Sequence, residues 1–140
     1  MWSKDPSTQV GSIAVNDLGQ TLSTGYNGFP RGVHDDERLN DRDLKYKIVV
    51  HAEANLVANA IQSLRGSTVY IWPFMPCSNC CGLLIQAGVS MIVSLKNDTE
   101  RWQESFRLTE QLCKEAGVSL VIHDPEQFNM WRGDFDGQTS

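Results

Sequence analysis

The sequence predicts a single α/β domain in three layers, with helices on both faces of a central sheet. The chain has 140 residues, which is the usual size of one domain. Hydrophobic residues make up 41% and charged residues 21%, an ordinary globular balance. Strand-like and helix-like segments follow the order β-β-α-β-α-β-α-β. We therefore expect a mixed five-stranded sheet whose later strands are parallel.

The first two strands are expected to form a hairpin. Residues 10–15 (VGSIAV) are short and largely apolar, and residues 21–26 (TLSTGY) alternate weakly, as a returning strand does. Residues 16–19 (NDLG) between them have the composition of a turn. Residues 27–43 are predicted to be irregular, because glycine and proline interrupt them.

Helices and strands alternate through the middle of the chain. Residues 47–64 are rich in helix formers with apolar residues at helical spacing, which predicts one helix ended by Gly66. Residues 68–72 (TVYIW) are β-branched and aromatic and predict a strand. After a loop bounded by prolines, residues 78–87 (SNCCGLLIQA) predict a second helix that Gly88 ends.

The last predicted elements are a strand at 89–95, an amphipathic helix at 99–116 and a strand at 118–123. The inner side of this helix is expected to carry Trp102, Phe106, Leu108 or Thr109, and Leu112. The tail from residue 124 is expected to be peripheral, with one short helix around Phe128 and Trp131. Because no repeat or linker-like stretch divides the chain, residues 1–140 are predicted to form one domain.

Charge, hydropathy and cysteine usage exclude several classes of protein. Twelve basic and 17 acidic residues give a net charge of −5, which excludes a basic nucleic-acid clamp but allows a local patch for a small anion. No apolar run approaches the roughly 18 residues of a membrane helix, and the first residues lack the apolar core of a secretory signal. Three of the four cysteines cluster within five residues, which favours metal chemistry in a reducing cytoplasm over a disulfide framework.

Two short segments carry the candidate chemistry, residues 51–53 (HAE) and residues 76–80 (PCSNC). The candidate metal ligands are His51, Cys77 and Cys80, and the nearby carboxylate is Glu53. Three nitrogen and sulfur ligands leave the fourth tetrahedral position of zinc open, which is the layout of a catalytic site. The two cysteines lie at a predicted helix start, where both sulfurs can face one point and the helix dipole favours their thiolates. The carboxylate can take a proton from a zinc-bound water and return it to a leaving group.

Two other interpretations of these cysteines stay open. A Cys-x-x-Cys pair can be a thioredoxin-like redox motif, although that motif follows the first strand of its fold and needs no His-x-Glu. A closed structural zinc site would use Cys81 as the fourth ligand, but adjacent helical residues point about 100° apart, which argues against Cys80 and Cys81 binding one ion. We expect Cys81 and Cys113 to be small buried hydrophobic residues.

The two segments together are the signature of zinc-dependent nucleobase deaminases. From Ser3 to about Val121 the chain resembles the deoxycytidylate (dCMP) deaminases of the cytidine deaminase superfamily. The segments that carry the resemblance are SKDPSTQVG (3–11), GYNGFPRGV (25–33), KYKIVVHAEAN (45–55), PCSNC (76–80) and LLIQAGV (83–89). The GYNGFPRG stretch is similar to the dCMP branch in particular. The resemblance implies a cytidine-deaminase-like α/β/α fold.

The resemblance also implies an activity, the zinc-dependent hydrolysis of dCMP to dUMP and ammonia, with one zinc ion per chain. The implied site consists of the zinc ligands His51, Cys77 and Cys80, the proton shuttle Glu53, Asn27 on the sugar hydroxyl, the backbone of Ala52 on the pyrimidine ring, and the phosphate candidates Lys4 and Arg31. Alternative substrates are deoxycytidine, dCTP, cytosine or an adenosine in tRNA. The alternative from another class is a non-catalytic binding protein stabilised by zinc.

Three features depart from the family pattern. Family members usually begin with a helix before the SKDP segment, whereas here Trp2 directly precedes it, so we expect either a truncated chain or a protein that manages without that helix. No cysteine precedes Cys77, so we expect none of the additional structural zinc found in some family members. The loop at 72–75 (WPFM) differs from the commoner Thr-Leu-x-Pro type.

Assembly and regulation follow from the same resemblance. Relatives form dimers or hexamers, and the apolar residues of the last helix and tail favour a homo-oligomer here as well. Many dCMP deaminases respond to dCTP and dTTP, and the candidate effector site is the loop at 28–43, with Arg31, Arg38 and Arg42 as its cations. Mg²⁺ is expected only as a bridge to such a nucleoside triphosphate.

Overall fold

The computed structural model describes residues 9–33 and 42–126 of the chain. The strands are β1 (Gly11–Val15), β2 (Thr21–Tyr26), β3 (Thr68–Trp72), β4 (Met91–Leu95) and β5 (Ser119–His123). The helices are α1 (Arg42–Ile48), α2 (Ala52–Asn59), α3 (Ser78–Gln86), the 3₁₀ helix η2 (Glu100–Trp102) and α4 (Gln103–Ala116). All five predicted strands are present, and the strand boundaries differ from the expected ones by two residues at most.

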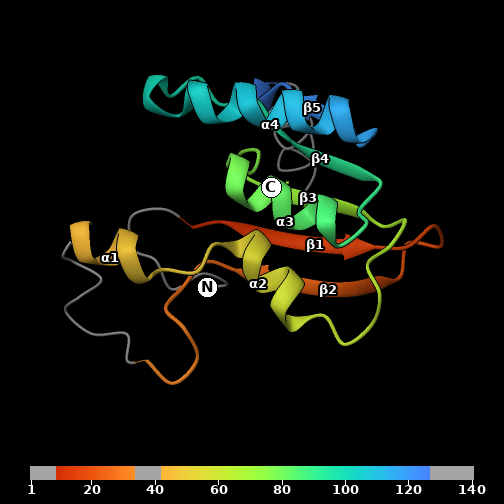
Figure 1. Ribbon diagram of the computed structural model, residues 1–140, viewed down its shortest axis with the longest axis horizontal. Helices are drawn as coiled ribbons and strands as arrows, with labels where there is room; N and C mark the ends of the chain where they lie inside the picture. Colours follow the sequence, from red (N-terminus) through yellow and green to blue (C-terminus); the bar gives the residue numbers. More distant parts are fainter. Residues whose placement is uncertain (1–8, 34–41, 127–140) are drawn as a thin grey trace, which may run out of the picture.

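The strands form one mixed sheet in the order β2-β1-β3-β4-β5. Strand β1 is antiparallel to both β2 and β3, whereas β3, β4 and β5 are parallel, as predicted. Gly11, at the start of β1, pairs with Tyr26 at the end of β2 and with Trp72 at the end of β3. The ends of β2, β3 and β4 therefore lie at one edge of the sheet, on the left in Figure 1, which we call the site edge.

Helices α2, α3 and α4 form one layer against the sheet (Figure 1). Side chains from one face of the strands share a buried core with these helices, and they include Ala14, Val69, Ile92, Leu56, Leu84 and Cys113. The opposite face carries Tyr70, which is 46% exposed. Two of the three predicted layers, the sheet and one layer of helices, are thus seen within residues 9–33 and 42–126.

The predicted single helix at 47–64 is wrong, because the chain is interrupted before His51 and the second helix ends at Asn59. Val50 forms an isolated antiparallel bridge with Gly28, in which each backbone N–H donates to the carbonyl of the other residue. This pairing holds His51 in an extended conformation, with φ −68° and ψ 155°. A tertiary backbone contact therefore overrides the local helix propensity.

Smaller differences concern the last helix and the segments outside the described residues. The expected helix at 99–116 begins with the 3₁₀ turn η2, and its inner side carries Thr109, whereas Leu108 is exposed. The segments outside the described residues include Lys4, the expected tail helix around Phe128 and Trp131, and half of the candidate effector loop, with Arg38. Among the helices that the structure describes, none has the length and apolar character needed to cross a bilayer.

Helix α2 and the segment just after it are held to the edge strand β2 by side-chain hydrogen bonds. Three amide groups donate to backbone carbonyls of β2, in the pairs Asn55 with Tyr26 (2.6 Å), Asn59 with Thr24 (3.5 Å) and Gln62 with Leu22 (3.4 Å). In the opposite sense, the buried Ser23 hydroxyl donates to the carbonyl of Leu56 at 2.7 Å. These bonds occupy polar groups of an edge strand and fix the position of α2, whose first residues follow His51.

The closest approach between β2 and α2 occurs at Gly25. A Cβ atom at this position would lie 2.2 Å from the carbonyl oxygen of Ala52 and 2.5 Å from the backbone nitrogen of Leu56. Both obstacles are backbone atoms of a helix, so they cannot move aside as a flexible side chain can. The absence of a side chain at Gly25 is therefore a condition for placing α2 on the sheet.

We expect Gly25→Ala to destabilise the protein by about 1–3 kcal/mol or more, because β2 and α2 must separate to accommodate the methyl group. Gly82→Ala is the matched control, since nothing lies within 4 Å of a Cβ added to that residue of α3. The control should gain about 0.5–1 kcal/mol, because alanine favours a helix interior over glycine. Urea unfolding midpoints measure both changes, and equal midpoints for the two variants would contradict the prediction.

Candidate metal centre

The first turns of α2 and α3 bring the predicted ligands together at the site edge. His51 is the N-cap residue of α2, Cys77 is the N-cap residue of α3, and Cys80 follows in the first turn of α3. The Nδ1 atom of His51 lies 3.3 Å from Sγ of Cys80 and 3.7 Å from Sγ of Cys77. One ligand atom from each residue lies within 4.8 Å of the other two.

These distances fit a tetrahedral zinc site. Zinc–nitrogen bonds of about 2.05 Å and zinc–sulfur bonds of about 2.3 Å give an N···S edge of about 3.6 Å, and both observed N···S distances are close to that value. Thiolate and imidazole donors suit zinc and are poor ligands for Mg²⁺ or Ca²⁺. The three donors would leave one coordination position for water or substrate.

Cys81 points away from this donor set. Its sulfur lies 3.5 Å from the sulfur of Cys113 and 3.9 Å from the carbonyl oxygen of Thr109. Cys81 and Cys113 are both buried, as predicted, and all four cysteines are free. Burial raises the pKa of Cys81 to about 12, so this thiol stays protonated at neutral pH. Cys81 therefore behaves as a small core residue, and a fourth ligand from this position is excluded.

The two cysteines of the donor set differ in their protonation. The pKa of Cys77 is lowered to about 4 by its hydrogen bond with Cys80, with a further contribution from His51. The pKa of Cys80 is raised, because the same hydrogen bond keeps its proton and because its sulfur is buried. In the metal-free protein Cys77 is thus a thiolate that is hydrogen-bonded to the protonated thiol of Cys80. A metal ion must displace the proton of Cys80 to bind both sulfurs.

Glu53 lies next to the donor set and is buried, with 4% of its surface exposed. Burial raises the pKa of its carboxyl group, although hydrogen bonds from its own backbone and from Cys80 oppose the shift. A carboxyl group with a raised pKa can both accept and release a proton near neutral pH. This is the property that an acid–base residue beside a metal centre requires.

Asn27 and Ala52 lie at the same edge as the metal centre. Asn27 directly follows β2 and is 7% exposed, and its Oδ1 accepts a hydrogen bond from the backbone N–H of Val10 at 3.0 Å. The carbonyl oxygen of Ala52 accepts a hydrogen bond from the hydroxyl of Ser12 at 2.9 Å. The N–H of Ala52 belongs to the first turn of α2, where backbone donors lack partners within the helix. Both residues are thus fixed to the start of β1, at the site edge.

Arg31 lies elsewhere than the metal ligands. Its guanidinium donates to Oδ1 of Asn59 at 3.3 Å, and Asn59 is the last residue of α2. Because a helix rises 1.5 Å per residue, this contact lies about 12 Å along the axis from His51. The structure therefore places Arg31 toward the opposite end of α2 from the metal centre.

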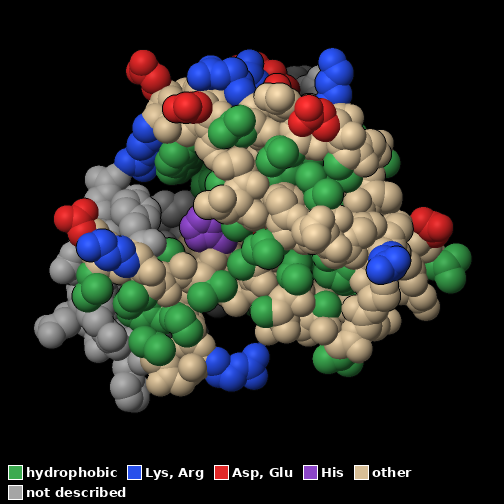
Figure 2. Space-filling model, viewed as in Figure 1, with side chains coloured by type: hydrophobic (Ala, Val, Ile, Leu, Met, Phe, Trp, Pro, Cys, Tyr) green, Lys and Arg blue, Asp and Glu red, His purple; other side chains and the backbone are tan. Residues whose placement is uncertain are grey.

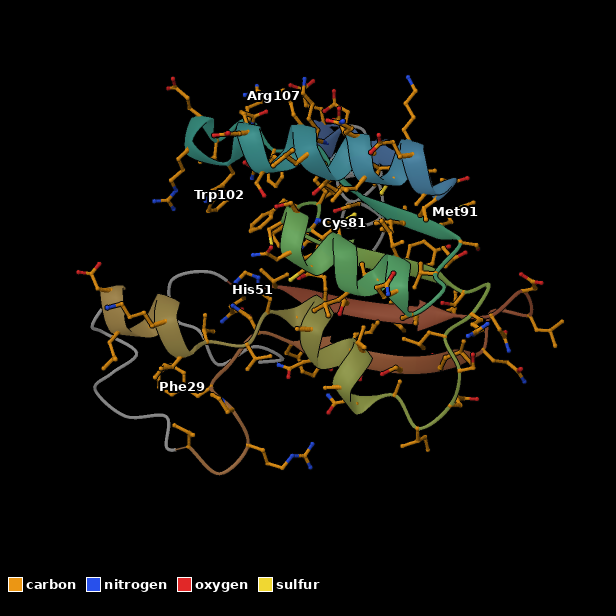
Figure 3. All side chains as sticks on the ribbon, viewed as in Figure 1. Phe29, His51, Cys81, Met91, Trp102 and Arg107 are labelled. Atoms are coloured by element: carbon orange, nitrogen blue, oxygen red, sulfur yellow. The ribbon has the colours of Figure 1, made fainter. Side chains whose placement is uncertain are left out.

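An aromatic cluster beside the metal centre was not predicted as part of the site. Phe74, three residues before Cys77, packs on Trp102 with ring centroids 4.8 Å apart, and Phe106 completes the cluster at 6.4 Å from each. Figure 3 shows Trp102 and His51 on facing sides of the space at the site edge, and Figure 2 shows His51 beside a hollow in the surface. The signal in the sequence was topological, because loops that follow adjacent parallel strands meet at one edge.

Comparisons with known proteins agree with this geometry. Residues 1–96 match the family model of the cytidine and deoxycytidylate deaminase zinc-binding region. An uncharacterized deaminase from the luxG 3′ region of Aliivibrio fischeri is 35% identical over 123 residues, covering 86% of this chain and 82% of the relative. The deoxycytidylate deaminase of Mus musculus is 37% identical over 131 residues, covering 89% of this chain and 72% of the mouse protein.

Solved structures show the same fold. The dCMP deaminase of cyanophage S-TIM5, in complex with dCMP and dUMP, superposes with a TM-score of 0.65 and 27% identity, covering 84% of this chain and 82% of the phage chain. A structure from a study of tRNA:A34 deaminases superposes with a TM-score of 0.52 and 17% identity, covering 81% and 82% of the two chains. The second likeness shows the fold alone. The cytidine-deaminase-like fold with its mixed five-stranded sheet is thereby confirmed.

We expect Cys80→Ala to abolish stoichiometric zinc binding, because two donors cannot hold the ion as three do. Cys81→Ala is the matched control on the next residue and should retain zinc, since its sulfur contacts Cys113 and not the donor set. Metal analysis of both purified variants measures the difference. Loss of zinc from the Cys81 variant alone would contradict the assignment.

Zinc affinity should rise with pH. Cys77, with its pKa of about 4, is already ionised at neutral pH, whereas Cys80, whose pKa is raised, must release a proton. The hydrogen bond with Cys77 also raises the pKa of His51, so below that pKa binding displaces a second proton. The association constant should therefore increase about tenfold per pH unit above the His51 pKa and about a hundredfold per unit below it.

Competition with a chelating dye across neutral pH measures this slope, and calorimetry in buffers of different ionisation enthalpy counts the released protons. The dye titrated with zinc alone corrects for its own pH dependence. A protein whose corrected zinc affinity is independent of pH would contradict the assigned protonation states.

Proposed function

The chain belongs to the cytidine and deoxycytidylate deaminase family, and from this membership we propose that it hydrolyses dCMP to dUMP and ammonia with one zinc ion per chain. The observation that carries the proposal is the three-donor centre with a buried carboxylate beside it, at distances that suit zinc. An open coordination position and an adjacent acid–base group are what hydrolytic deamination requires.

The proposed roles follow from the chemistry of each group. His51, Cys77 and Cys80 would hold zinc, and the ion when bound would supply an activated water for attack at C4 of the cytosine ring. Glu53 accepts a proton from the attacking water and delivers it to N3 of the ring, which makes C4 more electrophilic. The same carboxylate then takes the remaining proton of the attacking oxygen and passes it to the departing amine, so that ammonia leaves as the C4 carbonyl forms. Its raised pKa supports both halves of this transfer.

Substrate contacts are proposed on both sides of the reacting ring. The backbone N–H at Ala52 is suited to a ring carbonyl, and the side chain of Asn27 is suited to the sugar hydroxyl. Lys4 and Arg31 remain candidates for the phosphate, on the family resemblance of their segments. The hydrogen bond of Arg31 with Asn59 means that its side chain would have to reorient toward the metal centre.

We further propose that the protein is a homo-oligomer, a dimer or a hexamer. Leu83 on α3 and Leu108 on α4 are 44% and 46% exposed, and exposed apolar side chains on one helical layer favour an interface between copies. A reducing cytoplasm suits its four free cysteines. Mg²⁺ would enter only with a nucleoside triphosphate effector at the loop of residues 28–43.

A substrate panel tests the proposed activity. Ammonia release from dCMP should exceed that from deoxycytidine, dCTP, cytosine and a tRNA with adenosine at the wobble position, because the mouse relative is a deoxycytidylate deaminase and the cyanophage relative is a dCMP deaminase. A preference for another member of the panel would replace the proposed substrate and keep the chemistry. A protein that binds zinc and releases ammonia from none of them would reject the enzyme and leave a zinc-stabilised binding protein.

Glu53→Gln is the control for this panel. The variant has nearly the same volume, so it should bind zinc with the wild-type stoichiometry. Turnover should fall by at least about a hundredfold, the lower range for loss of a general acid–base group. Residual activity near the wild-type level would reject Glu53 as the proton shuttle and would point to a contaminating deaminase or to another base.

A further inference from the structure

The start of α4 is tied directly to the helix that carries the cysteine ligands. Ser105 accepts a hydrogen bond from the backbone N–H of Ser78 at 3.0 Å, and the buried hydroxyl of Thr109 donates to the carbonyl of Pro76 at 2.9 Å. Stacking of Trp102 on Phe74 adds an apolar contact on the same side. Residues 100–102 are thus held in a defined place beside Cys77.

Arg101 is positioned by this framework. Its guanidinium carbon lies 4.8 Å from the centroid of the Trp102 ring, a cation–π arrangement that restrains a long side chain. Arg101 is exposed, and no carboxylate of the described residues lies within salt-bridge distance of it. A stacked guanidinium keeps a planar set of N–H donors, which match the oxygens of a phosphate in pairs.

Several other cations of the described residues are engaged, buried or placed away from the site edge. Arg31 donates to Asn59 at the last residue of α2, and Lys96 lies 3.8 Å from the carboxylate of Asp98. Lys45 is buried in α1 and has an interaction partner. Arg65 precedes β3 and so lies at the opposite edge of the sheet. Arg101 combines exposure, restraint by the Trp102 ring and, through the stacking of Trp102 on Phe74, a place beside the loop before Cys77.

We propose that Arg101, held on the ring of Trp102, binds the 5′-phosphate of the nucleotide substrate. The inference rests on the proposed function, because it assumes that the ring of a nucleoside monophosphate enters the metal centre. The phosphate then lies toward the rim of the hollow beside His51, on the side where Trp102 stands (Figures 2 and 3). Trp102 acts as a positioning residue, and Arg101 makes the contact that separates a nucleotide from a nucleoside.

Two acidic residues that flank Arg101 in the sequence determine how it can recognise a phosphate. Glu100 and Glu104 are close to Arg101 in sequence and lower the positive potential around it. Recognition must therefore depend on the directed hydrogen bonds of the guanidinium rather than on a general basic patch. A lysine at position 101 keeps the charge but loses the planar donor set, so it should restore little of the function.

The test compares Arg101→Ala, Arg101→Lys and the matched control Arg107→Ala. Arg107 is an exposed arginine of α4, the helix that follows η2, and it lies on the side of α4 away from His51 (Figure 3). Kinetics with dCMP and deoxycytidine measure recognition of the phosphate, and calorimetry with dUMP and deoxyuridine measures binding without turnover. Zinc content is determined for each variant to show that the metal centre is intact.

Arg101→Ala should lower kcat/KM for dCMP and the affinity for dUMP about ten- to a hundredfold, the range for a lost charge-assisted hydrogen bond. Values for deoxycytidine and deoxyuridine should stay within about twofold, and Arg107→Ala should leave all four values unchanged. Trp102→Ala should lower kcat/KM for dCMP and the affinity for dUMP by part of the amount that Arg101→Ala does. Trp102→Phe, which keeps an aromatic ring, should return both values toward those of the wild type.

Two results would overturn the inference. Equal behaviour of Arg101→Ala and Arg107→Ala would remove Arg101 from phosphate recognition. An equal loss for nucleotide and nucleoside would mean that Arg101 supports the local structure only. Failure of the wild-type protein to deaminate dCMP is a separate outcome, because it rejects the proposed function whatever the Arg101 variants do.

Discussion

The close approach of β2 and α2 at Gly25 is the constraint on which the site depends. Backbone atoms of Ala52 and Leu56 occupy the space that a Cβ would need, so the helix rests directly on the strand. Amide side chains of α2, and of Gln62 just after it, then donate hydrogen bonds to backbone carbonyls of the same strand. Together these contacts place the first turn of α2, with His51 before it, against the first turn of α3.

The metal centre combines two helix starts with a buried acid. Helix N-termini favour negative charge, which helps the protein hold a thiolate at Cys77 in the absence of a metal ion. Burial has the opposite effect on Glu53, because a carboxylate loses hydration there and its pKa rises. The pKa of Cys77 is therefore lowered while the pKa of the neighbouring Glu53 is raised. As a result, the same centre can bind a cation and transfer a proton.

The loops that follow the parallel strands β3 and β4 lie beside this centre. Strands β3 and β4 end at the same edge, so the loop with Phe74 and the turn with Trp102 meet beside Cys77. Hydrogen bonds from Ser78 and Thr109 fix the two helices that follow these strands. The parallel half of the sheet thereby places a packed aromatic cluster beside the metal centre.

The sequence by itself indicated the zinc donor set, the adjacent acid, the order of strands and helices along the chain and the burial of Cys81, because these follow from ligand chemistry and from local periodicity. Only the tertiary structure decided that the chain breaks before His51, since the bridge between Val50 and Gly28 joins segments 22 residues apart. It also decided that Cys81 meets Cys113 and that Trp102 meets Phe74. Such contacts depend on how helices pack on a sheet, and no local pattern of residues encodes which side chains then become neighbours.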